Sequence, residues 1–148
     1  GGHCIAVDPW FLVSSDKGNT NLIQAARNVN IYKTKWVTSK ISKKINEMEL
    51  KYSRKIKVGC FGITFKPDID DLRESPALKI TNSLCSLGYD IYVCDPNIIE
   101  HKKLKFKSLE DIVQLCDLLV FLVAHEEFRN LKTFNKQTIN LCGLEIKT

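Results

Sequence analysis

Short, continuously apolar segments recur in the second half of this sequence and alternate with segments of helical character. Residues 118–123 read Leu-Leu-Val-Phe-Leu-Val, so an extended strand here is apolar on both faces and must be covered on both sides. Similar β-branched and apolar runs occupy residues 56–63, 90–95 and 138–142. This alternation predicts a parallel sheet with helices on both faces, the α/β class.

The connections between these strands carry helix signals. Ser75 followed by Pro76 is typical of an N-cap and a first helical position, and Gly88 marks the end of that helix. Ser108 is expected to cap a second helix, and residues 126–131 to form a short third one. The predicted fold is a Rossmann-like, doubly wound parallel sheet, in which ligands bind beyond the carboxyl ends of the strands.

The first predicted strand differs from a dinucleotide-binding strand. It continues into Gly-Cys-Phe-Gly at residues 59–62 instead of G-x-G-x-x-G, and no helix signal follows it directly. We therefore predict no helix N-terminus that could hold a pyrophosphate at this place. The ligand site is expected in the loops after Ile63 and Asp95, without NAD bound to this domain.

A long segment without Gly or Pro precedes the sheet region. From Asn19 to Tyr52 apolar residues recur at helical spacing, which predicts one long helix. These residues are Leu22, Ile23, Ala26, Val29, Ile31, Trp36, Val37, Ile41, Ile45 and Met48. One small domain cannot cover a helix of this length, so the helix either connects two domains or packs against a second subunit.

Composition narrows the classes of partner. The formal net charge of +5 comes from scattered lysines without zinc-finger spacing, which favours an anionic substrate over nucleic acid. The apolar runs contain Cys60, Cys85, Cys94 and Cys116 but no C-x-x-C pair, so we expect reduced core cysteines in a cytoplasmic protein. No apolar stretch is long enough to cross a membrane.

Two segments are dense in residue types that a core does not need. Residues 1–11 read GGHCIAVDPWF, and residues 65–77 read FKPDIDDLRESPA. Together they resemble the two signatures of the UDP-glucose/GDP-mannose dehydrogenase family, in particular its branch that oxidises UDP-N-acetylmannosamine. The long helix and residues 120–128 also fit, so the resemblance covers essentially the whole chain.

The resemblance implies that the C6 alcohol of a UDP-sugar is oxidised to a carboxylate with two NAD per turnover, for surface polysaccharide synthesis. Cys4 is then the nucleophile that attacks the C6 aldehyde and forms a thioester, and Asp8 assists the cysteine and the hydrolytic water. The remaining correspondences place Gly1, Phe65 and Lys66 at the UDP-sugar and Arg73 at the NAD.

Without the resemblance, the same residues allow other interpretations. Cys4 could be structural, Asp8 a turn residue ahead of Pro9, and residues 65–76 a solvated turn. Arg73 could pair with one of the neighbouring carboxylates, a role compatible with a contact to NAD. We expect His125 to be a loop residue, not a base.

The resemblance divides the chain into a catalytic cysteine loop (residues 1–18), a central helix (19–53) that joins two subunits in a homodimer, and a UDP-sugar-binding domain (54–148). The family's NAD-binding domain would precede Gly1, so we expect the chain to begin within a larger protein and to be inactive alone. The family usually has a basic, substrate-contacting residue where Cys142 stands. UDP-N-acetylglucosamine or UDP-glucose as substrate, or a non-catalytic nucleotide-sugar-binding fragment, remain as alternatives.

Overall fold

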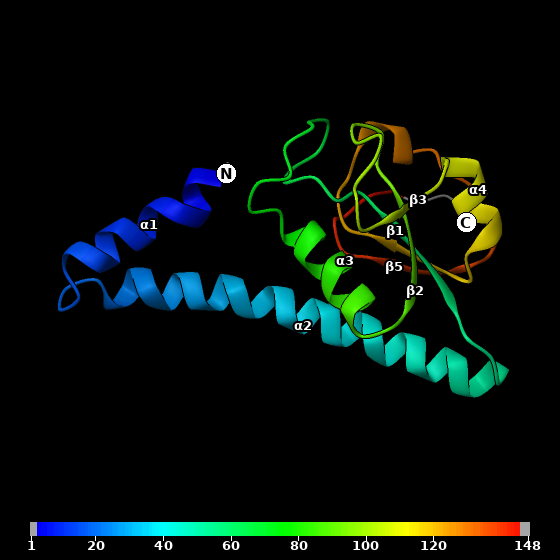
Figure 1. Ribbon diagram of the computed structural model, residues 1–148, viewed down its shortest axis with the longest axis horizontal. Helices are drawn as coiled ribbons and strands as arrows, with labels where there is room; N and C mark the ends of the chain where they lie inside the picture. Colours follow the sequence, from blue (N-terminus) through cyan, green and yellow to red (C-terminus); the bar gives the residue numbers. More distant parts are fainter. Residues whose placement is uncertain (1–2, 146–148) are drawn as a thin grey trace.

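The computed structural model of the protein describes residues 3–145, and its five strands form one parallel sheet in the order β3-β2-β1-β4-β5 (Figure 1). The strands are β1 (Lys57–Phe61), β2 (Asp90–Cys94), β3 (Lys105–Phe106), β4 (Leu118–Phe121) and β5 (Gln137–Asn140). Because β1 pairs with both β2 and β4, the chain crosses from one side of β1 to the other after β3. This order confirms the predicted doubly wound parallel sheet.

Two helices, α3 (Pro76–Ser86) and α4 (Leu109–Leu115), begin at the predicted caps. The others are α1 (His3–Ser15), α2 (Asn21–Tyr52) and the single 3-10 turn η1 (Glu126–Phe128). Ser75 Oγ accepts a hydrogen bond from the Leu78 N–H at 3.1 Å, and Ser108 Oγ accepts one from the Asp111 N–H at 3.1 Å. Both N-caps and the long helix α2 are therefore confirmed, whereas η1 is shorter than the predicted 126–131.

The segment expected as a catalytic loop is largely helical. Within residues 1–18, residues 3–15 form α1, although Pro9 lies inside the helix. The loop was implied by the resemblance. Pro9 removes one backbone hydrogen bond from the helix, and α1 packs along α2. The cysteine segment is thus carried on a regular element.

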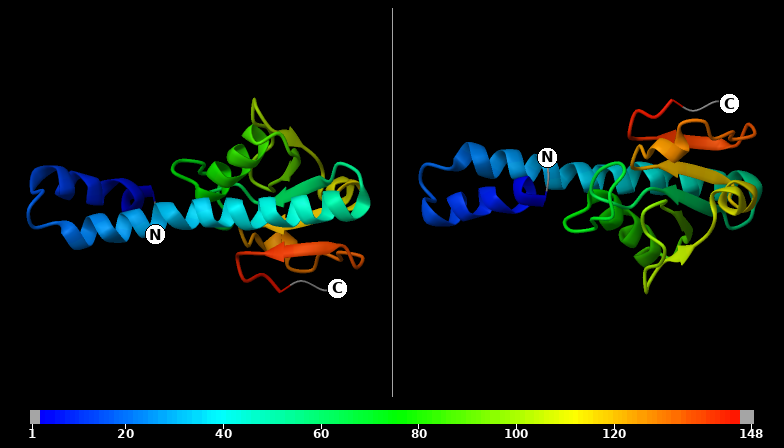
Figure 2. Two further views of the ribbon diagram at one scale, coloured as in Figure 1. Left: turned by 90° about the horizontal axis from the view of Figure 1, so that it is seen from below. Right: turned by 90° about the horizontal axis from the view of Figure 1, so that it is seen from above.

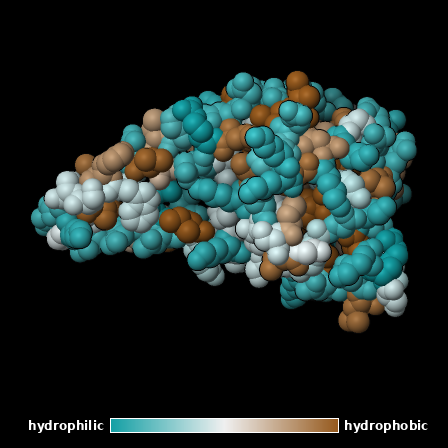
Figure 3. Space-filling view, viewed as in Figure 1, coloured by the Kyte–Doolittle hydropathy of each residue, from teal (hydrophilic) through white to brown (hydrophobic). Residues whose placement is uncertain are grey.

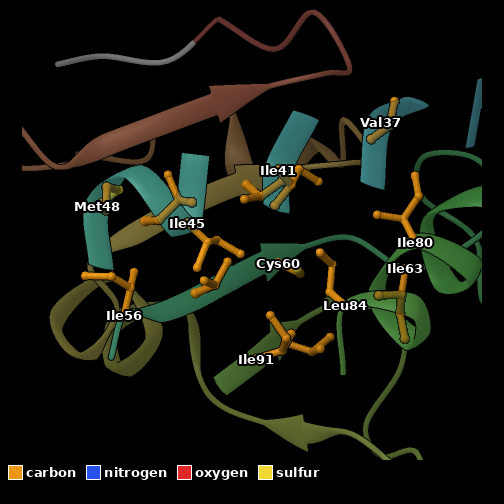
Figure 4. Packing of buried hydrophobic residues seen from close by; sticks show 14 residues of the cluster. Val37, Ile41, Ile45, Met48, Ile56, Cys60, Ile63, Ile80, Leu84 and Ile91 are labelled. Atoms are coloured by element: carbon orange, nitrogen blue, oxygen red, sulfur yellow. The ribbon is translucent and has the colours of Figure 1, made fainter. Parts of the chain in front are cut away.

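Two helical layers cover the sheet. On one face, the second half of α2 buries Val37, Ile41, Ile45 and Met48 against β1, β2, β4 and α3 (Figure 4). On the other face, α4 and η1 cover an aromatic cluster in which the rings of Phe61 and Phe121 stack at 4.5 Å between centroids. The core therefore lies around the sheet, and only half of α2 contributes to it.

The first half of α2 and the whole of α1 project beyond the sheet as a helical hairpin, the arm (Figures 1 and 2). The arm exposes the large apolar side chains Ile5, Val7, Phe11, Leu12, Leu22, Val29, Ile31, Tyr32 and Trp36. Apolar colour is correspondingly visible at the narrow end of the molecule (Figure 3). Within residues 3–145, no helix combines the length and the apolar character needed to cross a membrane.

The cysteines are free thiols, as expected. Cys60, Cys94 and Cys116 are buried, and burial raises the pKa of each to about 12. Cys85 is only half-buried, and Cys4 is exposed. The exposed thiol at the start of α1 therefore differs in environment from the core thiols.

Candidate functional site

The loop between β1 and α3, residues 62–75, leaves the carboxyl end of the sheet and is closed on itself. The Phe65 N–H donates to the carbonyl of Asp71 at 2.8 Å, which brings the two ends of the charged segment together. Thr64 Oγ1 donates to the carbonyl of Lys66 at 3.0 Å, and Ser75 Oγ donates to that of Ile63 at 2.7 Å. We call residues 64–71 the closed loop; its backbone is held while Phe65 is half-buried and Lys66 is exposed.

The start of α1 lies beside this loop (Figure 1). His3 Nδ1 is 3.6 Å from the Asp71 carboxylate, which also accepts hydrogen bonds from Arg73 Nε at 3.0 and 3.2 Å and from Arg73 Nη2 at 2.8 Å. These hydrogen bonds lower the pKa of Asp71 to about 2. In return the hydrogen bonds and the charge of Asp71 raise the pKa of Arg73. The expected pairing of Arg73 with a neighbouring carboxylate is confirmed.

Cys4 and Asp8 share one face of α1, because their spacing of four residues is close to one helical turn. Both side chains are exposed and line a shallow hollow of about 430 Å³ with Ile5, Pro9, Phe11 and Leu12. The structure therefore brings the two predicted catalytic residues together. Gly1, the other predicted residue of this segment, lies outside the described residues.

A groove of about 520 Å³ runs between α1, α2 and the N-terminal end of α3. Phe65 lines it, together with the cationic side chains Arg27, Lys35 and Lys79. Lys79 pairs with Glu74, whereas the buried Nε of Arg27 has no hydrogen-bond partner within the described part of the chain. The groove can therefore accept an anion beside a planar apolar group. Lys66 is not among the residues that line it, so the structure places only Phe65 of this predicted pair in the groove.

His125 and Asp95 form a buried polar network at the carboxyl ends of β4 and β2. His125 follows β4 in a loop, as expected, but its ring is fully buried. Its Nδ1 is 3.0 Å from the Asp68 N–H, and its Nε2 is 3.1 Å from Thr64 Oγ1 and 3.3 Å from the Asp95 carboxylate. This network was not predicted; its signal in the sequence is that polar residues directly follow two apolar strands.

Asp95 occupies the position, at the end of the second strand, where a dinucleotide-binding domain has its ribose-binding acid. Its carboxylate instead accepts the N–H groups of Ile63 at 2.7 Å and Asn97 at 3.0 Å. Burial acts to raise the pKa of Asp95, but the hydrogen bonds from His125, Ile63 and Asn97 outweigh burial and lower it. The carboxylate is thus used inside the protein and is not free to accept hydrogen bonds from a ribose.

Cys142 lies just beyond β5, where a basic residue was expected. Its N–H donates to Asn140 Oδ1 at 3.3 Å, and burial raises the pKa of its thiol. A neutral, half-buried thiol cannot supply the charge of the missing basic side chain.

Comparisons with known proteins agree with the resemblance in the two signatures. A sequence profile described as "UDP-glucose/GDP-mannose dehydrogenase family, UDP binding domain" matches residues 59–142. The UDP-N-acetyl-D-mannosamine dehydrogenase of Salmonella typhimurium is 41% identical over 138 residues, covering 87% of this chain and 33% of the relative. The enzyme of the same name from Campylobacter jejuni is 39% identical over 150 residues, covering 96% of this chain and 35% of the relative. The chain therefore spans about one third of the length of these curated relatives.

Solved structures show the same arrangement of elements. The UDP-N-acetyl-mannosamine dehydrogenase of Staphylococcus aureus superposes on 100% of this chain with a TM-score of 0.75 and 33% identity, using 35% of that chain. A UDP-glucose dehydrogenase from Pyrobaculum islandicum superposes on 99% of this chain and 36% of its own with a TM-score of 0.78. Its identity is 20%, so it supports the fold alone.

Proposed function

Because the chain belongs to the UDP-glucose/GDP-mannose dehydrogenase family, we propose that it is the substrate half of an NAD-dependent UDP-sugar 6-dehydrogenase. The proposed substrate is UDP-N-acetylmannosamine, and the uronate product would serve surface polysaccharide synthesis. The observation that carries the proposal is the position of Cys4 at the start of α1, where the adjacent His3 lies 3.6 Å from the Asp71 carboxylate of the closed loop. An exposed thiol, a carboxylate one turn away and a cationic groove suit oxidation of an anionic sugar substrate.

The described residues do not build a dinucleotide site of the usual kind, because α3 begins only fifteen residues after β1 and the Asp95 carboxylate is buried. NAD would therefore be held by a separate domain, with the exposed Arg73 reaching it, and when bound would accept the hydrides from C6. The steps that belong to this chain begin with addition of the Cys4 thiolate to the C6 aldehyde, which gives a hemithioacetal. After C6 has lost its second hydride, water that Asp8 helps to deprotonate hydrolyses the thioester and releases the carboxylate and the thiolate.

Two alternatives differ from this proposal in testable ways. UDP-N-acetylglucosamine or UDP-glucose could be the substrate, and rates of NADH formation with each UDP-sugar, measured on the full-length protein that carries this chain, separate the three. A non-catalytic nucleotide-sugar-binding function is favoured by one observation, the neutral Cys142 at the position of a basic residue. A protein that binds UDP-sugars but forms no NADH with any of them would support this second function.

We propose that Lys66, which lies outside the groove, contacts the part of the anionic ligand that extends beyond it. Lys66→Ala should then weaken UDP binding by about ten- to a hundredfold, because a charge-assisted hydrogen bond is lost. The melting temperature should stay the same, since the side chain is exposed and only the carbonyl of Lys66 is used by Thr64. Calorimetric titration of UDP into the full chain measures the affinity. Lys51→Ala is the matched control, because Lys51 is equally exposed at the distant end of α2.

Equal UDP affinity of the Lys66 and Lys51 variants would contradict the role of Lys66 but not the UDP site. A wild-type chain that binds no UDP at millimolar concentration would contradict the proposed function itself.

We also propose a homodimer formed through the arm, whose apolar side chains would otherwise stay in water. Val29→Glu combined with Trp36→Glu should raise the dimer dissociation constant by at least about a hundredfold, because both side chains would be central in such an interface. Light scattering at micromolar concentration measures the mass. Ile99→Glu, which changes an exposed apolar residue outside the arm, should leave the dimer intact. A wild-type monomer with α2 folded is the result that rules the dimer out.

A further inference from the structure

We propose that His125 is a positioning residue that holds the closed loop, and with it Phe65, in the geometry that binds the nucleotide sugar. The identity of the ligand rests on the proposed function, whereas the anchoring of the closed loop is inferred from the contacts of the His125 ring alone. His125 comes from the end of β4 and is separated from the loop by about sixty residues of chain, as its contact with Thr64 spans 61 positions. It is therefore a long-range anchor.

The hydrogen bonds around the ring determine its tautomer. The Asp68 N–H can only donate, so Nδ1, at 3.0 Å from it, must be the unprotonated acceptor. Thr64 already donates its hydroxyl hydrogen to the Lys66 carbonyl, so Thr64 Oγ1 can only accept from Nε2–H. The Asp95 carboxylate, at 3.3 Å from Nε2, accepts as well. All three partners require a neutral ring that carries its hydrogen on Nε2.

This tautomer connects the loop to the sheet at two points. Nδ1 fixes the backbone of Asp68, which has a positive φ of 60° at the tip of the loop, and the Asp68 carboxylate in turn accepts the Glu126 N–H at 3.0 Å. Nε2 fixes Thr64, whose hydroxyl holds the Lys66 carbonyl. Phe65 lies between the two anchored positions, so the direction in which it enters the groove depends on them.

The ring itself has little freedom to move. Phe128 contacts it edge-on with 5.4 Å between ring centroids, and the Asn97 side-chain amide is 3.1 Å from Nδ1. Without His125, the Asp68 N–H would lose its acceptor and Thr64 Oγ1 would lose a donor, so the tip of the loop is expected to open towards water. The expected consequence is a looser closed loop on an intact sheet.

Two substitutions distinguish anchoring of Asp68 from simple filling of the site. In His125→Asn the side-chain oxygen stands in for Nδ1 and can still accept from Asp68, whereas in His125→Gln the amide extends to the position of Nε2 and leaves Asp68 without its acceptor. We expect hydrogen exchange of the Asp68 amide, measured by NMR on the full chain, to be about tenfold or more faster in the Gln variant than in the Asn variant. UDP affinity should fall roughly tenfold in the Gln variant only.

A role limited to filling space predicts the opposite order, because glutamine is the larger side chain and should preserve packing better. Equal hydrogen exchange of the Asp68 amide in the two variants, or exchange that follows the melting temperature, would overturn the anchoring role of His125.

If the variants fail to fold, the ¹⁵N shifts of the wild-type His125 ring still decide: a hydrogen on Nδ1 contradicts the proposal, and one on Nε2 supports it. An unaltered UDP affinity together with faster Asp68 exchange in the Gln variant overturns the link to the ligand. A wild-type chain that binds no UDP contradicts the proposed function while the exchange test of the anchor still stands.

Discussion

Replacing Cys4 with serine is expected to abolish formation of the uronate in the full-length protein that carries this chain, by roughly three orders of magnitude or more. A serine hydroxyl is hardly ionised near neutral pH, so it cannot add to the C6 aldehyde as a thiolate does. Binding of the UDP-sugar should be largely unchanged, because Cys4 is exposed on α1 and Phe65 enters the groove from another element. Product analysis for the uronate and calorimetry for the UDP-sugar measure the two effects separately.

The matched control is Cys85→Ser, which changes a half-buried thiol on α3 and should retain most of the activity. Uronate production by Cys4→Ser at the wild-type rate would remove Cys4 from the mechanism.

Asp8→Asn should lower the rate of thioester hydrolysis while leaving Cys4 able to react, so enzyme with the substrate carbon still bound to Cys4 would accumulate.

Local signals in the sequence predicted most of the fold. The caps Ser75 and Ser108 depend on contacts within three residues of chain, and the buried strands on continuous apolar runs. β3 escaped prediction because it is a two-residue edge strand, Lys105–Phe106, without an apolar run of its own. The resemblance implied a loop where α1 forms, and α1 is a helix without buried residues that packs along α2.

The candidate site was predictable only in part, because most of its contacts join residues that are far apart in the sequence. Cys4 and Asp8 were named together from the resemblance, and their shared helix face follows from the helical conformation of α1, which was not predicted. The choice between Phe65 and Lys66 as the side chain that enters the groove follows from the closure of the loop by Asp71. The contacts of His125 reach across 57 and 61 positions, and no local pattern encodes such distances.

The space for the His125 ring is provided by Gly62, which leads to the largest expected effect on stability. Gly62 has a positive φ of 82°, and a Cβ added to it would lie 2.5 Å from Val123 Cβ and 3.1 Å from His125 Cδ2. Gly62→Ala should therefore lower the free energy of unfolding by about 2 to 5 kcal/mol, the sum of backbone strain and overpacking. Urea denaturation of the full chain followed by circular dichroism measures the loss.

The comparison with Gly88→Ala separates these two causes. Gly88 has nearly the same φ, 83°, but nothing lies within 4 Å of an added Cβ, so only the backbone strain of about 1 kcal/mol should remain. The difference between the two variants then measures how firmly β4 and His125 are held against β1. A small difference would mean that Val123 and His125 move aside at little cost, and in that case the Gly62 variant should also show faster hydrogen exchange at Asp68. A large difference with an unfolded or strongly destabilised Gly62 variant is the result that a rigid network at this edge of the sheet requires.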